Sequence, residues 1–411
     1  MSLLLDTTDP LFLGLFESYR KQTIRDLFGL ATTPLSPIAA RTFGALISML
    51  RHLFRTCPNQ ILDILTHPTL SVLIHYATNE TRHPNSPHAN IEPIVTQLCS
   101  QLLCQLSFAG LLPPTGIYFP LLVDQLFCPG ANITIMCKPN SQTTRFDNQT
   151  ILFDINDQPH PIFFDWKQPA TELDQAVVVS PGYVRITPTL QLALVDNNPL
   201  WAYEAHPEKS GNALNLGNHT PKEWVDSLTE ALAIIELTLP CLKTEIDHIL
   251  RLVVPTGYDE QRHLSASYKE AVGIVYMTLH PRLLTMVEAI VHEFQHNKLN
   301  AVTYLDPLLN NAFEPLFPSP VRPDPRPLHG VLLAAHAFLP IAELYLQLIR
   351  QRHILTMSGG FDERLRMIVA ANTDACATLR AADPTKLGEE LLTEMWEMNR
   401  RHHQQLAELS L

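Results

Sequence analysis

The chain has 411 residues, of which 46% are hydrophobic and 17% are charged, and its net charge is −12. A chain of this length can bury a sizeable core, and its acidic balance argues against a nucleic-acid binder, which needs a basic surface. Seven cysteines without a C-x-x-C spacing argue against a disulfide framework and a structural zinc knuckle. No secretory signal and no apolar run of about 18 residues is evident, so we expect a cytoplasmic protein without membrane partners.

Residues 1–129 are predicted to form a helical N-terminal region. Between about Ser36 and Leu126, apolar residues recur at helical spacing, with short breaks rich in proline, asparagine and histidine. The pattern changes over residues 130–200, where alternating or β-branched runs are separated by turn-forming residues. This second region is expected to form a small antiparallel sheet.

Residues 201–411 are predicted to be mainly helical. Thr220 is a suitable N-cap, Pro221 occupies the first helical position, and Glu223 completes a capping box. These three residues predict a helix that continues to about Leu237.

Four further elements follow in the same region. Residues 273–279 form a continuous apolar and β-branched run, which predicts a buried strand. A helix is expected over about 282–304, followed by a proline-rich loop at 315–327 and a second helix over about 328–352. The region is therefore expected to carry most of the chemistry on two long helices.

The first of these helices contains His292, Glu293 and His296 in an H-E-x-x-H sequence. Residues i and i+4 share one helical face, so the two imidazoles can bind one metal ion. The flanking residues are apolar, and buried imidazoles need partners. The expected fold is mainly α with a small β-rich region, in which a zincin-like HExxH helix packs near a short sheet.

A third metal ligand is expected from the second helix. His329, His336 and Glu343 follow one another at intervals of seven residues, so they lie along one stripe of that helix. His336 is the favoured ligand, and His329 and Glu343 are the alternatives. A carboxylate would complete the facial triad of non-haem iron oxygenases, whereas three histidines would suit iron or zinc.

Four sequence motifs occur in this chain in the order that is found in one known family. They are Ala205–Asn212, Ser265–Ser267, Val291–Ala301 and Asp324–Leu328. In these motifs the chain resembles the HExxH-type, 2-oxoglutarate-dependent peptide β-hydroxylases of ribosomal peptide biosynthesis. The resemblance covers about residues 195–350.

This resemblance implies an enzyme that uses Fe(II), 2-oxoglutarate and dioxygen to hydroxylate a side-chain β-carbon of a ribosomally made precursor peptide. It implies that His292 and His296 bind the iron. Arg326 would bind the far carboxylate of 2-oxoglutarate, because a guanidinium group can bind a carboxylate through two parallel hydrogen bonds. We also expect Ser265, Ser267 and His329 to line the cosubstrate pocket.

Two other functional classes compete with the oxygenase. In a zinc metallopeptidase, Glu293 would be the catalytic general base, and Glu343 or His336 would be the third ligand. In the oxygenase, Glu293 would instead orient an imidazole or a neighbouring helix. A non-catalytic protein with a structural metal is the third class, for which a closed four-ligand site would be evidence.

Overall fold

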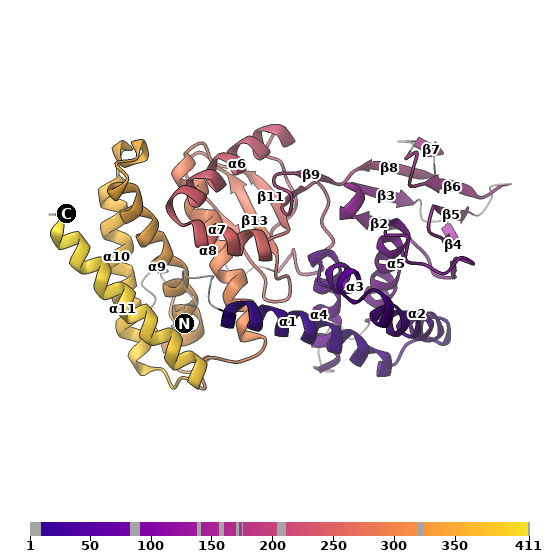
Figure 1. The fold of residues 1–411 in the computed structure, drawn as a ribbon, viewed down its shortest axis with the longest axis horizontal. Coiled ribbons are helices and arrows are strands. Elements are labelled where there is room, and N and C mark those ends of the chain that lie inside the picture. Colours follow the sequence, from indigo (N-terminus) through magenta and orange to yellow (C-terminus); the bar gives the residue numbers. More distant parts are fainter. Residues whose placement is uncertain are drawn as a thin grey trace. The chain divides into compact units, whose positions relative to one another are not determined.

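The structure is a computed structural model. It is mainly helical, with 56% helix and 16% strand, and its strands form small sheets. The chain divides into two compact units, which are described separately below (Figure 1). The described residues are 10–82, 91–137, 141–155, 160–169, 172–174, 176–203, 211–318 and 324–409.

The N-terminal unit comprises Arg20–Arg185 and Gln191–Leu214. Its helices are the second half of α1 (Pro10–Gly29), then η1 (Leu30–Thr32), α2 (Pro37–Thr56), α3 (Pro58–Leu65), α4 (Pro68–Arg82), α5 (Glu92–Phe108) and η2 (Pro129–Ala131). Its strands are β1 (Ile117–Phe119), β2 (Gln125–Cys128), β3 (Ile133–Cys137), β4 (Ser141–Phe146), β5 (Thr150–Ile155), β6 (Ile162–Asp165), β7 (Glu172–Asp174), β8 (Val177–Pro181), β9 (Tyr183–Arg185) and β10 (Gln191–Ala193).

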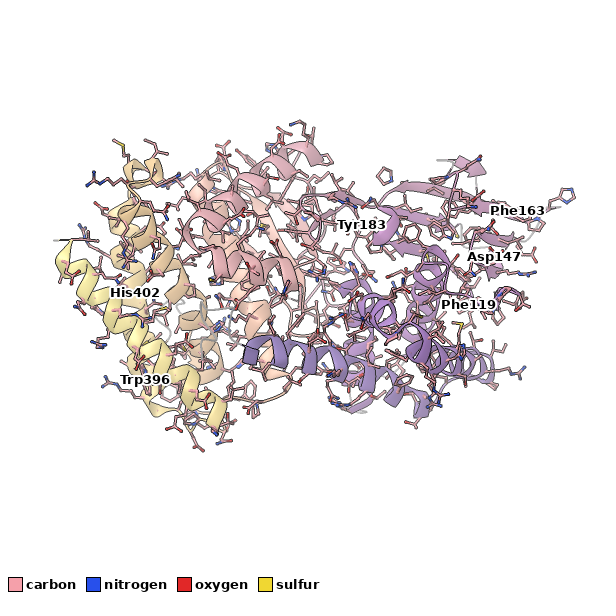
Figure 2. The ribbon with its side chains drawn as sticks, viewed as in Figure 1. Phe119, Asp147, Phe163, Tyr183, Trp396 and His402 are labelled. Carbon is pink, nitrogen blue, oxygen red and sulfur yellow. The ribbon has the colours of Figure 1, made fainter. Side chains whose placement is uncertain are left out.

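Two four-stranded antiparallel sheets form the β-rich part of this unit, with the orders β1-β4-β5-β6 and β2-β3-β8-β7. Successive side chains along a strand point to opposite faces. In the first sheet, Phe119 and Phe153 are therefore fully buried, whereas Tyr118 and Phe163 are exposed. Figure 2 labels Phe119 and Phe163. The predicted antiparallel sheet is present.

The strands begin earlier in the sequence than the prediction placed them. The helical segment that was expected to reach Leu126 ends with α5 at Phe108, and β1 and β2 follow before residue 129. Gly110 and Gly116 adopt positive φ angles of 69° and 68°, which L side chains rarely adopt. These two turns end the helical region, and the apolar residues after them pair as strands.

The C-terminal unit comprises Met1–Tyr19, Ile186–Leu190 and Asn215–Leu411. Its remaining helices are α6 (Pro221–Thr238), α7 (Pro240–Ile249), α8 (Leu283–Thr303), α9 (Leu328–Arg350), η3 (Ile354–Met357), α10 (Phe361–Thr378), η4 (Leu379–Ala381) and α11 (Lys386–Glu408). Its strands are β11 (Leu252–Tyr258), β12 (Ser265–Ala266), β13 (Ile274–Leu279), β14 (Leu316–Phe317) and β15 (Arg326–Pro327).

The predicted helices and the predicted buried strand of this unit are confirmed, whereas the predicted proline-rich loop at 315–327 contains β14 and β15 and lies partly outside the described residues. The capping box at Thr220 and Glu223 is present and begins α6. All six residues of β13 are buried, and this strand pairs in parallel with β11 and antiparallel with the short β12. The two long predicted helices are α8 and α9, and α9 continues through Pro340.

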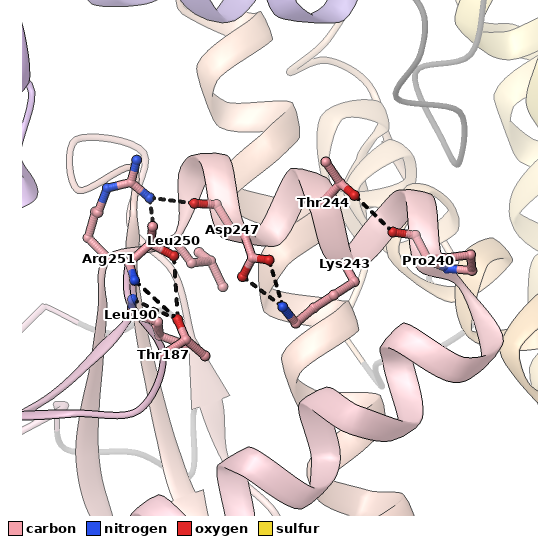
Figure 3. A network of polar contacts seen from close by, with 9 residues as sticks. Thr187, Leu190, Pro240, Lys243, Thr244, Asp247, Leu250 and Arg251 are labelled. Atoms are coloured by element: carbon pink, nitrogen blue, oxygen red, sulfur yellow. Dashed lines mark hydrogen bonds and ion pairs between the residues drawn. The ribbon is translucent and has the colours of Figure 1, made fainter.

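A network of polar contacts ends α7 and stabilises the start of β11 (Figure 3). Arg251 Nη1 donates hydrogen bonds to the carbonyls of Asp247 and Leu250, and Nη2 donates one to the carbonyl of His248. Lys243 forms an ion pair with Asp247 one turn further along. The guanidinium thus satisfies carbonyl groups that the end of a helix leaves without partners.

Helices α9, α10 and α11 pack together in the C-terminal unit (Figure 1). Within the described residues, α9 is long and apolar enough to cross a membrane by length and composition, but 67% of its most apolar window is buried in the protein, as in a core helix. Two side chains of α11 contact the neighbouring helices: Trp396 donates a hydrogen bond to the backbone carbonyl of Cys376, and His402 is hydrogen-bonded to the carboxylate of Glu343 (Figure 2).

The start of α11 lies very close to the main chain of a preceding loop. At Gly388, an added Cβ would lie 1.9 Å from the carbonyl oxygen of Leu308.

Candidate metal centre

One turn of α8 brings the two histidines of the HExxH sequence together. His292 Nε2 lies 2.9 Å from His296 Nε2, and the rings meet edge to face. Burial, and then the charge of His296, lowers the pKa of His292 well below its usual value. Burial also lowers the pKa of His296, although the charge of Glu293 opposes this. Both imidazoles are therefore neutral near pH 7, and neutral imidazole is the form that binds a metal ion.

Glu293 completes a group of three candidate ligands with these histidines. Their ligand atoms all lie within 4.8 Å of one another, and no other such group occurs in the part of the chain that the structure describes. The side chain of Glu293 is buried, and its Oε2 accepts a hydrogen bond of 2.6 Å from Ser267 Oγ. Ser267, which was predicted to line the cosubstrate pocket, therefore contacts the site through Glu293.

Asn297 anchors this turn of α8 to the neighbouring sheet. Its Oδ1 accepts a hydrogen bond from the backbone of Gly273, and its Nδ2 lies within hydrogen-bond distance of the carbonyl of Ile274. The same Nδ2 donates to Ser267 Oγ at 3.0 Å. A buried polar network whose members are satisfied in this way makes a local structure rigid. The position of Glu293 is thus fixed from two directions.

A buried ion pair holds the next residue of the helix. Lys298 Nζ lies 2.8 Å from both carboxylate oxygens of Glu245, which belongs to α7, and each side chain is only 1% exposed. The pair joins α8 to α7 directly after the two histidines. Neither residue was singled out by the sequence analysis, because a lysine and a glutamate 53 positions apart carry no local signal of pairing.

The favoured third ligand, His336, is buried in α9 but does not belong to the group of three. Phe338 of α9 contacts His292, with its ring centroid 5.0 Å from that of the imidazole. His336 is not among the ligand atoms that lie within 4.8 Å of one another at the HExxH turn, and its role as third ligand stays a prediction.

Glu343, one of the alternative ligands, binds α11 instead. Its carboxylate accepts hydrogen bonds from Gln347 and Arg350 and lies 3.2 Å from His402 Nε2. Burial alone would raise the pKa of Glu343, but the bonds from His402 and Gln347 and the charge of Arg350 lower it to about 2. Glu343 is therefore an ionised anchor for α11.

His329, the other alternative, lies in the first turn of α9. Its backbone N–H donates to the carbonyl of Ala312 at 2.8 Å. Burial, and then the charges of Lys269 and His296, lower the pKa of His329 to about 4. The contribution of His296 indicates that His329 lies near the motif histidines.

Arg326 lies in β15, directly before α9, and pairs with Phe317 of β14. Its Nε lies 3.0 Å from Asp324 Oδ2. The two groups form an ion pair, but their geometry is not that of a hydrogen bond. Nε and Nη2 are both buried and donate no hydrogen bond to any described residue. This edge of the guanidinium could therefore bind a carboxylate through two hydrogen bonds.

Ser265 lies in β12, opposite Met277 of β13. Residues 204–210, which include most of the predicted motif at Ala205–Asn212, lie outside the described residues.

Other residues at the site were missed from the sequence. Glu288 lies one turn before His292 on the same face of α8, and this spacing could have identified it. Arg364 of α10 forms an ion pair with Glu288 at 2.7 Å. Only the packing of α10 against α9 brings Arg364 here, so the sequence carries no local signal for it.

Comparison with models of protein families gives no match to this chain, and comparison with curated proteins gives none either.

Proposed function

We propose that this protein is a cytoplasmic Fe(II)- and 2-oxoglutarate-dependent oxygenase that hydroxylates a side-chain β-carbon of a ribosomally made precursor peptide. The observation that carries the proposal is the convergence of His292 Nε2 and His296 Nε2 at 2.9 Å. Two neutral imidazoles whose nitrogens lie this close together could bind the same metal ion, and two histidines with a third ligand would suit non-haem iron.

Each residue of the site has a part in this proposal. His292 and His296 hold the iron, and the third ligand comes from α9, where His336 is the favoured residue and His329, whose pKa is lowered in part by the charge of His296, is an alternative. When bound, iron with 2-oxoglutarate and dioxygen supplies the oxidising chemistry. Arg326 offers its two buried donors to the far carboxylate of the cosubstrate. Ser267 and Asn297 fix Glu293, which keeps the histidine-bearing turn in place.

The surroundings of the site support a zincin-like local arrangement. The short strand β12 runs antiparallel to β13, and Ser267, directly after β12, bonds to the HExxH turn of α8. β12 is the edge strand of the sheet that contains β13, and extended peptides can bind by adding to the edge of a sheet. This is consistent with a peptide as the substrate.

A zinc metallopeptidase is the second candidate, and one observation favours it. A carboxylate oxygen of Glu293 lies within 4.8 Å of both imidazole nitrogens, where a general base for a metal-bound water would be. The bond from Ser267 occupies Oε2, so only the other oxygen would be available to take the proton.

Metal analysis combined with cosubstrate turnover tests the proposal. Protein prepared without oxygen should bind about one Fe(II), and it should convert 2-oxoglutarate to succinate faster when the peptide encoded beside its gene is present. His292→Ala and His296→Ala should lose metal and turnover, whereas His403→Ala, at an exposed position of α11, should lose neither. Peptide fragments formed with zinc and without oxygen would instead establish the peptidase.

A further inference from the structure

Two side-chain contacts join helices α8 and α9 beside the metal centre. The hydroxyl of Tyr345 donates a hydrogen bond to the carboxylate of Glu288. The ring of Phe338 meets that of His292 edge to face, with centroids 5.0 Å apart. Glu288 and His292 are one turn apart on α8, and Tyr345 and Phe338 are about two turns apart on α9, so each pair shares a face of its helix.

One side chain of α10 touches a residue from each of these two contacts. Arg364 Nη2 and Nε lie 2.7 Å and 3.1 Å from Glu288 Oε2. The Arg364 guanidinium carbon also lies 5.9 Å from the ring centroid of Phe338, within the range of a cation–π contact. Arg364 therefore contacts both the carboxylate of Glu288 and the aromatic ring of Phe338.

The orientation of His292 depends on this packing. A histidine that binds a metal usually has its ring fixed by a hydrogen bond from its second nitrogen. In the part of the chain that the structure describes, the one hydrogen-bond contact of His292 is made by Nε2, with His296. The ring of Phe338 also contacts the imidazole and can constrain its orientation.

We propose that Phe338, held by Arg364 and Glu288, is a positioning residue that sets the orientation of the His292 imidazole at the metal. The inference rests on the proposed metal site and goes beyond it. In this site, an aromatic ring supported by an ion pair takes the place of the usual hydrogen bond to the ligand. The residues that influence metal binding therefore include Arg364 of α10, a helix that provides none of the proposed ligands.

The test measures Co(II) affinity and the Co(II) visible spectrum, which reports ligand geometry and does not depend on turnover. Phe338→Leu should weaken Co(II) binding roughly 10–100-fold, the usual effect of losing a group that orients a ligand. Its spectrum should also change. Phe338→Tyr keeps the ring and should restore both properties. Arg364→Ala should shift the affinity and spectrum in the same direction as Phe338→Leu.

Arg350→Ala is the matched control, because Arg350 is similarly exposed (44%, against 41% for Arg364) and also pairs with a glutamate. It should leave affinity and spectrum unchanged. Wild-type affinity and spectrum in Phe338→Leu, or in Arg364→Ala if Phe338→Leu does not fold, would overturn the inference alone. A wild-type protein that binds no Co(II) would overturn the proposed metal site, and the inference with it.

Discussion

Replacing Lys298 by Met tests how the metal-bearing helix is held in place. The change leaves the Glu245 carboxylate, which is 1% exposed, without its cationic partner. Two unit charges 2.8 Å apart attract each other by about 6 kcal/mol at an effective dielectric constant of about 20, and desolvation offsets part of this. Removing one member of such a buried pair typically costs about 3–5 kcal/mol. We expect Lys298→Met to lower the free energy of unfolding of the C-terminal unit by this amount.

Urea denaturation followed by tryptophan fluorescence measures the loss. Adding Glu245→Leu to Lys298→Met should recover most of the lost stability, because an apolar pair leaves no buried charge. The control is Lys222→Met in the exposed pair of Lys222 and Asp226, where the change should cost at most about 1 kcal/mol. A loss below about 1 kcal/mol in Lys298→Met would refute the argument that an unpaired buried charge governs this contact.

Three further predictions concern single residues of the site and its supports. Glu293→Gln should keep oxygen-dependent succinate formation, reduced roughly 10–100-fold, because Ser267 can still donate a hydrogen bond to the amide oxygen. A loss of activity of roughly 10²–10⁴-fold together with intact metal binding would fit a general base instead. Arg326→Ala should raise the apparent KM for 2-oxoglutarate by the equivalent of about 2–5 kcal/mol without affecting Fe(II) binding, and an unchanged KM would leave Arg326 as a partner of Asp324 alone. Glu343 has its pKa lowered from 4.5 to about 2, so its stabilising contribution is present above about pH 4.5 and is lost as the pH falls towards 2. The stability difference between wild type and Glu343→Gln, measured by urea denaturation, should therefore shrink over this pH range, and a constant difference would contradict the assignment.

Local sequence signals predicted much of the C-terminal unit. The capping box of Thr220 and Glu223 fixes where α6 begins, because it depends on residues three positions apart. The pairing of His292 with His296 is equally local, since one helical turn determines it. Such features follow from backbone geometry alone and do not depend on the packing of distant segments.

The third ligand could not be chosen in this way. Helical spacing shows that His336 and Glu343 share a stripe of α9, but not which neighbouring helix that stripe meets. In the structure, the contact with His292 is made by Phe338, and Glu343 meets α11. Tertiary packing determines which neighbour a helical face meets, and the periodicity of one helix carries no information about that packing.

The strands at Ile117–Phe119 and Gln125–Cys128 were missed for a different reason. Each has only three or four residues, and a short apolar run fits a helix and a strand equally well. Their assignment depends on pairing with β4 and β3, which come later in the sequence.

The close approach at Gly388 has a consequence for how this protein can vary. Even alanine at this position would place its Cβ 1.9 Å from the carbonyl oxygen of Leu308, and a main-chain atom cannot move aside as a flexible side chain can. Natural selection should therefore keep glycine here wherever the same helix junction is retained. A glycine at this place in a distantly related sequence would be a marker that the last helix starts against the same loop, even where the rest of that helix has diverged beyond recognition.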